Sequence, residues 1–377
     1  MNFFLQGRKY SPQDLISEAS SGHLPQFLGP VIRFLEFWFS DKPHFEASTS
    51  GSTSAPKSVL ISRKKIQASA AMTLAFLKAD PSTDGFILCL PADKAGGFMV
   101  LARALQGNLD VLLLEPTLSP FGLFPLFADK RQWLVSLVPP QLDSVLDSDQ
   151  FISASRNWKG ILLGGAAIPR KTIYRVRSLN CPVYHTFGMT ETVSHFAVRK
   201  IWDPSDVSFQ PEAPYVLLPG LDMQISENQT LLVRGEVTEM EWMDTGDVAE
   251  RAVGRTDAFY FLGRRDEVIN SGGLKIHPDA VRKSWEQAFP RWQANPVFMG
   301  LEDEKWGWKL VMVLANSEIQ GFPPEAFMAD WAKSEDPKKL PKSVYCIPEI
   351  SRTSTMKTNI QALRTLLTGM NPVWEKK

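Results

Sequence analysis

The chain has 377 residues, of which 44% are hydrophobic, and carries 41 basic and 41 acidic side chains. This length predicts two domains, at roughly 100–200 residues per domain. The net charge of zero excludes a general electrostatic attraction to nucleic acid or anionic membrane, so any anion site must be local. The three cysteines are far apart and odd in number, which excludes a disulfide framework or a cysteine metal cluster and favours a reducing compartment.

The N-terminal residues lack the long apolar core of a signal peptide. The apolar stretch at residues 31–39 is interrupted by Arg33 and Glu36 and is shorter than the roughly 20 residues of a membrane-spanning helix. We therefore expect a soluble cytoplasmic protein that binds neither nucleic acid nor membrane. Whether it forms a homodimer is left open.

In chain order, the first part alternates between continuous apolar runs and helical patterns. The runs lack the alternation of half-exposed strands, which predicts parallel strands covered on both faces, at 85–91, 108–116, 132–140 and 159–165. The helical patterns lie at 62–79, 94–106 and 169–179, with Ser62 and Pro169 at helix starts. Such alternation predicts an α/β domain with a parallel sheet.

After about residue 210 the pattern changes to short strands joined by turns. The last hundred or so residues indicate an α+β unit with helices near 278–289 and 359–367 and a strand at 343–348. The polar turn at 263–267 separates the two patterns. We therefore predict a first domain over 1–265 and a mobile second domain over 266–377.

A run of small, mostly hydroxyl-bearing residues at 47–57 ends in Pro56 and Lys57. By itself, the run is about equally compatible with a flexible linker and with a phosphate-binding loop. Strand-like segments on both sides, at 44–48 and 58–62, place it inside a folded unit and favour the loop. Gly51 would let the backbone approach a ligand, and Lys57 would supply a positive charge.

Six segments in order resemble the motifs of the adenylate-forming superfamily, which includes acyl- and aryl-CoA synthetases, luciferases and peptide-synthetase adenylation domains. They are TSGSTSAPK (49–57), LLGGAAIP (162–169), YHTFGMTET (184–192), DTGD (244–247), GRRDEVINSGGLKIHP (263–278) and RTSTMKTNIQALR (352–364). The resemblance covers nearly the whole chain. It implies a large α/β N-terminal domain with mostly parallel sheets and flanking helices, here N-terminally shortened, and a small mobile α+β C-terminal domain.

The resemblance also implies a two-step reaction. A carboxylate attacks the α-phosphorus of ATP, pyrophosphate leaves, and a thiol, usually that of coenzyme A, then displaces AMP from the acyl-adenylate. Such chemistry depends on positioning and charge neutralisation more than on covalent catalysis. The expected ligands are ATP, Mg²⁺, coenzyme A and a small carboxylic acid.

For the phosphates, the resemblance implies six residues of the first motif: Thr49, Ser50, Gly51, Ser52, Thr53 and Lys57. Glu191 would hold Mg²⁺, with a plain helix-start residue as the alternative. Thr190 would reach the α-phosphate. Lys357 would neutralise charge on the α-phosphate and the attacking carboxylate, and a solvated loop lysine is its alternative.

For the adenine, the resemblance implies a slot formed by the second and third motifs: Gly164, Gly165, Ala166, His185, Thr186, Phe187 and Gly188. Glycines let a flat base lie against the backbone. Phe187 stands where the family usually has Tyr and would stack on the base. Core packing is the alternative for this side chain.

The remaining implied roles belong to the fourth and fifth motifs. Asp247 would bind both ribose hydroxyls, and Arg264 would support the ribose and the phosphates. Asp266 would be the hinge on which the second domain rotates. Gly272 and Gly273 would line the path of the pantetheine arm. A turn is the alternative for Asp247 and for both glycines.

Three departures from the family pattern bear on activity. Ser54 and Met356 stand where the family usually has Gly, and residues 91–97 lack the usual His. In overall length and in the residues of its second and third motifs, the chain most closely resembles the compact o-succinylbenzoate–CoA ligases of menaquinone synthesis. Lys94 and His195 are candidate cations for a second substrate carboxylate.

Two further functions remain open at this point. One is an adenylating enzyme that passes its acyl group to a carrier protein or another acceptor. The other is a degenerate nucleotide-binding protein without turnover, for which Ser54, Met356 and the missing His are the motivation. The leading hypothesis is an acid–CoA ligase.

Overall fold

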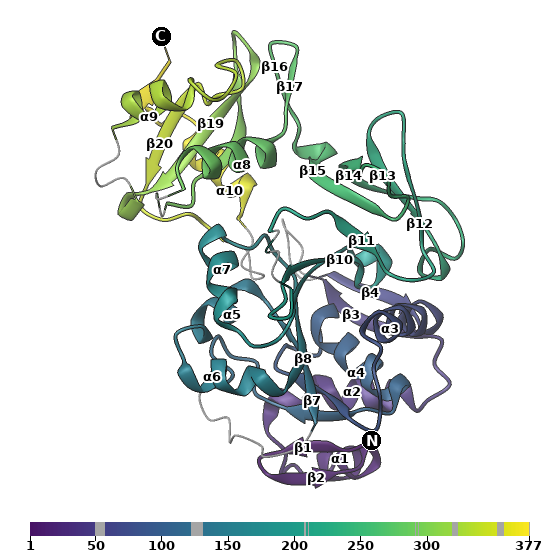
Figure 1. The fold of residues 1–377 in the computed structure, drawn as a ribbon. Coiled ribbons are helices and arrows are strands. Elements are labelled where there is room, and N and C mark those ends of the chain that lie inside the picture. The colour runs from purple at the N-terminus through teal and green to yellow at the C-terminus, as the bar shows by residue number, and fades with distance from the viewer. Residues whose placement is uncertain are drawn as a thin grey trace.

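The computed structural model describes residues 1–49, 57–121, 131–206, 209, 211–290, 292, 294–318, 323–352 and 358–376. Two large sheets organise this part of the chain (Figure 1). A 13-stranded sheet has the order β12-β13-β14-β15-β11-β10-β9-β8-β7-β5-β6-β1-β2, and a 6-stranded sheet contains β16 to β21. A separate two-stranded sheet pairs β3 (His44–Thr49) with β4 (Lys57–Ser62).

Half of the large sheet is a parallel array. Neighbouring strands run parallel from β1 through β6, β5, β7 and β8 to β9, and β2 pairs antiparallel at the edge. The bounds are β1 (Phe3–Leu5), β2 (Arg8–Tyr10), β5 (Asp84–Leu88), β6 (Asp110–Leu113), β7 (Gln132–Leu137), β8 (Trp158–Leu163) and β9 (Val183–Gly188). The four apolar runs of the sequence thus form β5 to β8, as predicted.

Helices cover both faces of this array, which is why its strands are apolar throughout. Along β5, Phe86 and Leu88 pack into one core with α2, α3 and α4, whereas Ile87 packs into the other with α5, α6 and α7. The helices are α1 (Pro12–Ala19), α2 (Gly29–Trp38), α3 (Arg63–Leu77), α4 (Ala95–Gly107), α5 (Pro139–Val145), α6 (Asp149–Ala154) and α7 (Arg170–Arg175). Ser62 caps α3 by accepting from the Lys65 N–H, as its place in the sequence predicts.

The other half of the large sheet is antiparallel. It contains β10 (His195–Trp202), β11 (Tyr215–Leu217), β12 (Asp222–Ile225), β13 (Thr230–Arg234), β14 (Met243–Arg251) and β15 (Ala258–Arg264). This is the region of short strands and turns. Its aromatic core includes Phe196 and Phe259, both fully buried.

The 6-stranded sheet follows the predicted seam. The last strand of the large sheet ends at Arg264 and the small sheet begins at Ile269. Its strands are β16 (Ile269–Ser271), β17 (Leu274–Ile276), β18 (Val297–Asp303), β19 (Gly307–Ala315), β20 (Ser343–Ile347) and β21 (Trp374–Glu375), with helices α8 (Pro278–Ala288), α9 (Pro324–Trp331) and α10 (Ile360–Leu367). A mobile second domain beginning at residue 266 stays a prediction.

Helix length and the burial of one cysteine can be described for these residues. Within them, every helix is too short or too polar to cross a membrane. Cys89 is fully buried, and burial raises the pKa of its thiol to about 12.

Candidate active site

The proposed adenine slot lies where two neighbouring parallel strands end. Gly164–Ala166 follow β8 directly, and His185 on β9 is the register partner of Leu163 on β8. The Thr186 hydroxyl donates to the Leu163 carbonyl over 3.2 Å, so the two strand ends are tied together. The carboxyl end of a parallel sheet is the usual place for a ligand crevice in α/β folds.

Gly164 allows a close approach that no other residue would permit. A Cβ at this position would lie 2.4 Å from the Thr186 hydroxyl oxygen. The next residue, Gly165, has φ +88°, a conformation that L-residues rarely adopt. The backbone therefore turns sharply after β8 and carries no side chain toward β9. A bare backbone is what the predicted adenine slot would need, and binding of a base here stays a prediction.

His185 is buried at 8% exposure, and its two shortest hydrogen bonds define its tautomer. Its Nδ1 accepts from the Tyr215 hydroxyl over 2.8 Å, and its Nε2–H donates to the Ala166 carbonyl over 3.2 Å. Burial, with Arg199 nearby, lowers the pKa of His185 to about 3. The imidazole is therefore neutral, and it holds the slot backbone in place.

Phe187 belongs to an aromatic cluster. Its ring lies 4.9 Å from that of Tyr215, 5.4 Å from Phe259 and 5.2 Å from Phe261, between ring centroids. Phe187 therefore packs in the aromatic core, as the alternative for this residue expected. Its ring is only partly buried, so stacking on a base stays a prediction.

The connection from β9 to β10 is unusually tight. A Cβ on Gly188 would lie 2.2 Å from the Ser194 carbonyl oxygen, so only glycine fits there. Val193 has φ +66° and ψ −46°, and the Ser194 N–H donates to the Thr192 carbonyl over 2.7 Å. This is a γ-turn of the rare, strained kind.

Thr190 and Glu191 lie on the short 3₁₀ helix that this turn closes, Thr190–Thr192. Both side chains are exposed. No described residue forms an ion pair or hydrogen bond with the Glu191 carboxylate. The carboxylate is thus available to a cation, as its predicted role requires.

The proposed ribose site pairs a buried carboxylate with an arginine. Asp247 on β14 is 6% exposed, and the Arg264 guanidinium on β15 donates to it over 3.1 Å. Arg264 also donates to the Thr245 carbonyl and to Asp266. Burial raises the pKa of Asp247 above its usual range, and Arg264 opposes this shift. Arg264 therefore links the ribose candidate to the hinge candidate.

The glycine pair of the fifth motif forms a hairpin turn. Gly272 and Gly273 join β16 to β17 with φ +59° and +85°, as a two-residue turn with two positive φ angles requires. Both glycines therefore form a turn, which is the alternative that the sequence left open for them. Gly272 also lies against the Trp306 ring, where a Cβ would come within 2.8 Å. A role in the pantetheine path stays a prediction.

Several predicted residues lie outside the described part of the chain. These are residues 50–56 of the first motif, with Ser54, and residues 353–357, with Met356 and Lys357. The first segment joins β3 to β4, whose residues Thr49 and Lys57 are register partners. The second joins Arg352 to Thr358, which form an antiparallel bridge.

A buried arginine that the sequence reading missed lies beside this site. Arg103 on α4 is 2% exposed, and its Nη2 donates to the Ser194 hydroxyl over 3.1 Å and contacts His195 Nδ1 at 3.5 Å. Its Nε has no partner among the described residues. Burial lowers its pKa to about 9, so the group stays charged near neutral pH. The sequence feature that could have pointed to Arg103 is a lone arginine within the apolar helical pattern at 94–106.

His195 and Lys94, the two cations expected from the sequence, lie in different environments. His195 is buried, and burial together with Arg103 lowers its pKa well below the usual value. It is a neutral partner of Arg103 and Thr73, not a cation. Lys94 forms an ion pair with its neighbour Asp93. The buried positive charge of this region belongs to Arg103.

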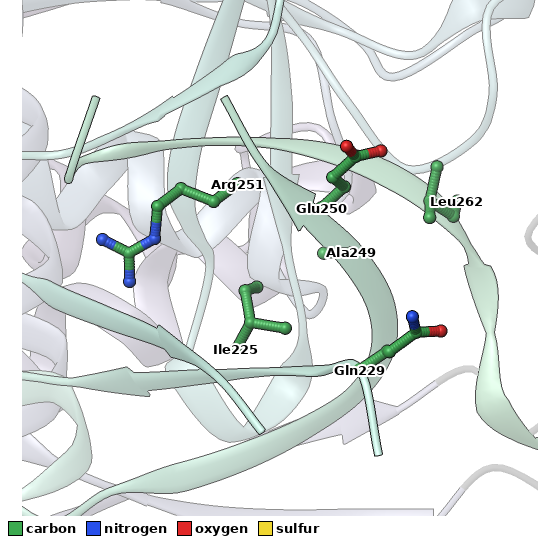
Figure 2. A pocket seen from close by; sticks show the side chains of 6 residues that line it. All are labelled: Ile225, Gln229, Ala249, Glu250, Arg251 and Leu262. Carbon is green, nitrogen blue, oxygen red and sulfur yellow. The ribbon is translucent and has the colours of Figure 1, made fainter. Parts of the chain in front are cut away.

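A separate pocket of about 470 Å³ lies over the antiparallel strands (Figure 2). It is lined by Ile225, Gln229, Ala249, Glu250, Arg251 and Leu262. None of the motif residues lines it, although Asp247 is on the same strand as Ala249.

Comparison with known proteins defines the class. Residues 43–240 match the family model described as AMP-binding enzyme. The chain therefore belongs to this family, which confirms the resemblance seen in the six motifs. Its fold, a mixed large sheet with flanking helices and a small second sheet, is that of the adenylate-forming enzymes.

Individual relatives are consistent with this class. The chain is 26% identical to a 2-succinylbenzoate–CoA ligase from Bacillus cytotoxicus over 85% of its own length and 69% of the relative's. It is 30% identical to an acyl-CoA synthetase (AMP-forming)/AMP-acid ligase II-like protein from Dyadobacter fermentans, with a TM-score of 0.59, covering 93% of this chain and 98% of that one.

A third likeness concerns the fold alone. The o-succinylbenzoate CoA synthetase of Bacillus subtilis, in complex with its acyl-adenylate intermediate, has a TM-score of 0.69 at 20% identity, covering 88% of this chain and 70% of that one. The chain spans between 60% and 70% of the length of several curated ligases that it matches.

Proposed function

We propose that the chain is an ATP-dependent acid–CoA ligase that activates 2-succinylbenzoate. One substrate carboxylate attacks the α-phosphorus of ATP and releases pyrophosphate, and the coenzyme A thiol then displaces AMP to form the thioester. The named activity of the curated relatives supports this reaction. Coenzyme A as the acceptor, rather than a carrier protein, rests on those names.

The observation that supports 2-succinylbenzoate as the substrate acid is the buried guanidinium of Arg103. 2-Succinylbenzoate has two carboxylates, and the one that does not react needs a positive partner when it leaves water. Arg103 contacts Ser194 and His195, which follow Glu191 by three and four positions. A desolvated arginine with an unpartnered Nε fits a carboxylate better than it fits an uncharged group.

The chain's own residues fit the nucleotide and the metal. Asp247 accepts the ribose hydroxyls, Arg264 orients Asp247, and the bare backbone after β8 receives the base. Glu191 fits a Mg²⁺ ligand because its carboxylate is exposed and unpaired among the described residues. A bound Mg²⁺ supplies neutralisation of phosphate charge. Lys357 supplies positive charge to the adenylation step.

The primary test is ATP–pyrophosphate exchange with a panel of acids that includes 2-succinylbenzoate, with wild type and Lys357→Ala. We expect exchange that depends on 2-succinylbenzoate and falls by at least about 100-fold in the variant, because a transition-state charge contact is lost. Thioester formation with free coenzyme A separates the ligase from an enzyme that uses a carrier protein. ATP binding without exchange for any acid would favour the degenerate protein.

The variant Arg103→Met tests whether Arg103 binds the second carboxylate of the substrate. We expect KM for 2-succinylbenzoate to rise about 10- to 100-fold, because a charged hydrogen bond is lost, while KM for ATP stays within about two-fold. Arg156→Met, at an exposed position on the chain, is the matched control. An equal rise in KM for 2-succinylbenzoate and for an uncharged-tail acid such as benzoate would exclude Arg103 as the second-carboxylate site.

A further inference from the structure

Tyr215 lies next to the proposed adenine slot but in none of the six motifs. It is on β11, between β10 and β15, and is 6% exposed. Its hydroxyl reaches His185, which in turn reaches the Ala166 carbonyl on the other side of the slot. The three residues come from separate segments that only the sheet order brings together.

We propose that Tyr215 is a positioning residue for the adenine slot, because its hydroxyl fixes the His185 tautomer that holds the Ala166 backbone. The role in nucleotide binding rests on the proposed function.

The proton positions follow from the partners of His185. The Ala166 carbonyl can only accept, so Nε2 must carry the proton. Nδ1 must then accept, and two donors point at it: the Tyr215 hydroxyl at 2.8 Å and Arg199 Nη2 at 3.4 Å. The tyrosine contact is the short one. Burial keeps the imidazole neutral, so protonating Nδ1 instead would remove the proton that Ala166 receives.

The Tyr215 ring is itself held on several sides. It stacks on Phe259 with centroids 5.7 Å apart and an interplanar angle of 24°, and the Arg199 guanidinium carbon lies 4.9 Å from its centroid. Phe187, the residue predicted to stack on adenine, lies 4.9 Å away. The hydroxyl therefore has little freedom to leave His185, and the ring packs against the β9 side of the slot.

Removing only the hydroxyl isolates this role. Tyr215→Phe keeps the ring and its aromatic contacts, and leaves Nδ1 with the longer Arg199 contact. We expect the dissociation constant for ATP, measured by calorimetry on the full chain, to rise about three- to ten-fold, as for loss of one buried hydrogen bond. Binding of inorganic pyrophosphate, which has no base, is expected to be unchanged. Tyr260→Phe, exposed on β15, is the matched control.

A spectroscopic readout separates positioning from general stability. The chain has five histidines, so long-range ¹H–¹⁵N spectra of ¹⁵N-histidine protein resolve each ring, and His185→Leu assigns one. Wild type should show His185 with the proton on Nε2, and Tyr215→Phe should shift or broaden this signature. The two variants should also be non-additive in ATP affinity, since they break one chain of contacts.

The possible outcomes separate the two proposals. An unchanged His185 tautomer in Tyr215→Phe, or additive losses of affinity, overturns the role of Tyr215. If the wild type shows the Nε2–H tautomer but binds no ATP, the Tyr215–His185–Ala166 contacts are a structural unit and the proposed function is contradicted. Equal losses of ATP and pyrophosphate binding would show a general effect on the fold and also overturn the role.

Discussion

Val193 combines a buried β-branched side chain with a backbone conformation that such residues avoid. It is 1% exposed, and its φ of +66° places it in a γ-turn between Thr192 and Ser194. The turn follows Thr190 and Glu191 and precedes the residues that contact Arg103. Strain of this kind persists where the surrounding structure requires it, and it is concentrated at functional sites.

A pair of substitutions tests this strain. Because glycine adopts positive φ at no cost, Val193→Gly should be more stable than Val193→Ala by about 1 kcal/mol in the free energy of unfolding. The order should reverse at Val198, a buried residue of β10 with ordinary strand geometry, where Ala should be the more stable. Urea denaturation measures both pairs. If Ala were the more stable at both sites, Val193 would be unstrained.

Asp247 offers a second test at this scale. Its carboxylate is desolvated and held by Arg264, and both of its oxygens can accept hydrogen bonds from ribose hydroxyls only while it is ionised. Asp247→Asn should weaken ATP binding by about 10-fold or more, since one acceptor becomes a donor. Calorimetry checks this, with Asp257→Asn, an exposed partner of Arg255, as control. Unchanged affinity would remove Asp247 from the ribose site.

At the scale of elements, α8 is where the small sheet meets the large one (Figure 1). Arg170 at the start of α7 donates to the Glu286 carbonyl of α8, and Lys283 donates to the Phe261 carbonyl of β15. Within α8, Arg282 pairs with both Asp279 and Glu286. Among the described residues, these polar contacts join the two sheets here. A movable second domain, which stays a prediction, would need such contacts rather than a large apolar interface.

Loss of these contacts should loosen the small sheet without unfolding either core. We expect the double variant Arg170→Ala, Lys283→Ala to be cleaved faster by trypsin near residues 263–267, because local opening exposes the connecting turn. The free energy of unfolding of the large sheet should change by less than about 1 kcal/mol. Arg156→Ala, a surface change, should leave cleavage as in wild type. Identical cleavage rates for all three proteins would argue that these contacts do not hold the small sheet.

At the scale of the whole molecule, two buried neutral histidines couple stability to pH. The pKa values of His185 and His195 are both lowered by burial, to about 3 for His185. The unfolded chain takes up a proton at each near pH 6.5, whereas the folded chain does not. Their stabilising contribution is therefore complete above pH 6.5 and is lost as the pH falls.

Urea unfolding between pH 6.5 and 5.5 measures this effect. Each histidine should contribute a fall approaching about 1.4 kcal/mol per pH unit in the lower part of this window. Replacing either with Leu should flatten the slope, whereas His44→Gln, an exposed control, should not. A slope that does not depend on residues 185 and 195 would show that they are protonated in the folded chain.

Much of the fold and part of the site could be predicted from the sequence. Continuous apolar runs identify β5 to β8 because strands covered on both faces must be apolar along their whole length. The six motifs named Asp247, Arg264 and the glycines after β8, since phosphate, ribose and base each need particular chemistry near the backbone. Gly164 and Gly188 could be foreseen as glycines of a motif, but not the contacts that require them.

Arg103, Tyr215 and Arg199 could not be assigned from sequence, because their roles depend on neighbours far along the chain. Arg103 meets Ser194, and Tyr215 meets His185, 30 residues away. For His195, the sequence suggested a cation, and burial reversed that reading by favouring the neutral imidazole. Local pattern determined the elements and the order of the motifs, because periodicity and turn chemistry act between near neighbours. Only the tertiary structure decided which side chains are desolvated and paired, because burial and charge depend on groups that the sheet order brings together.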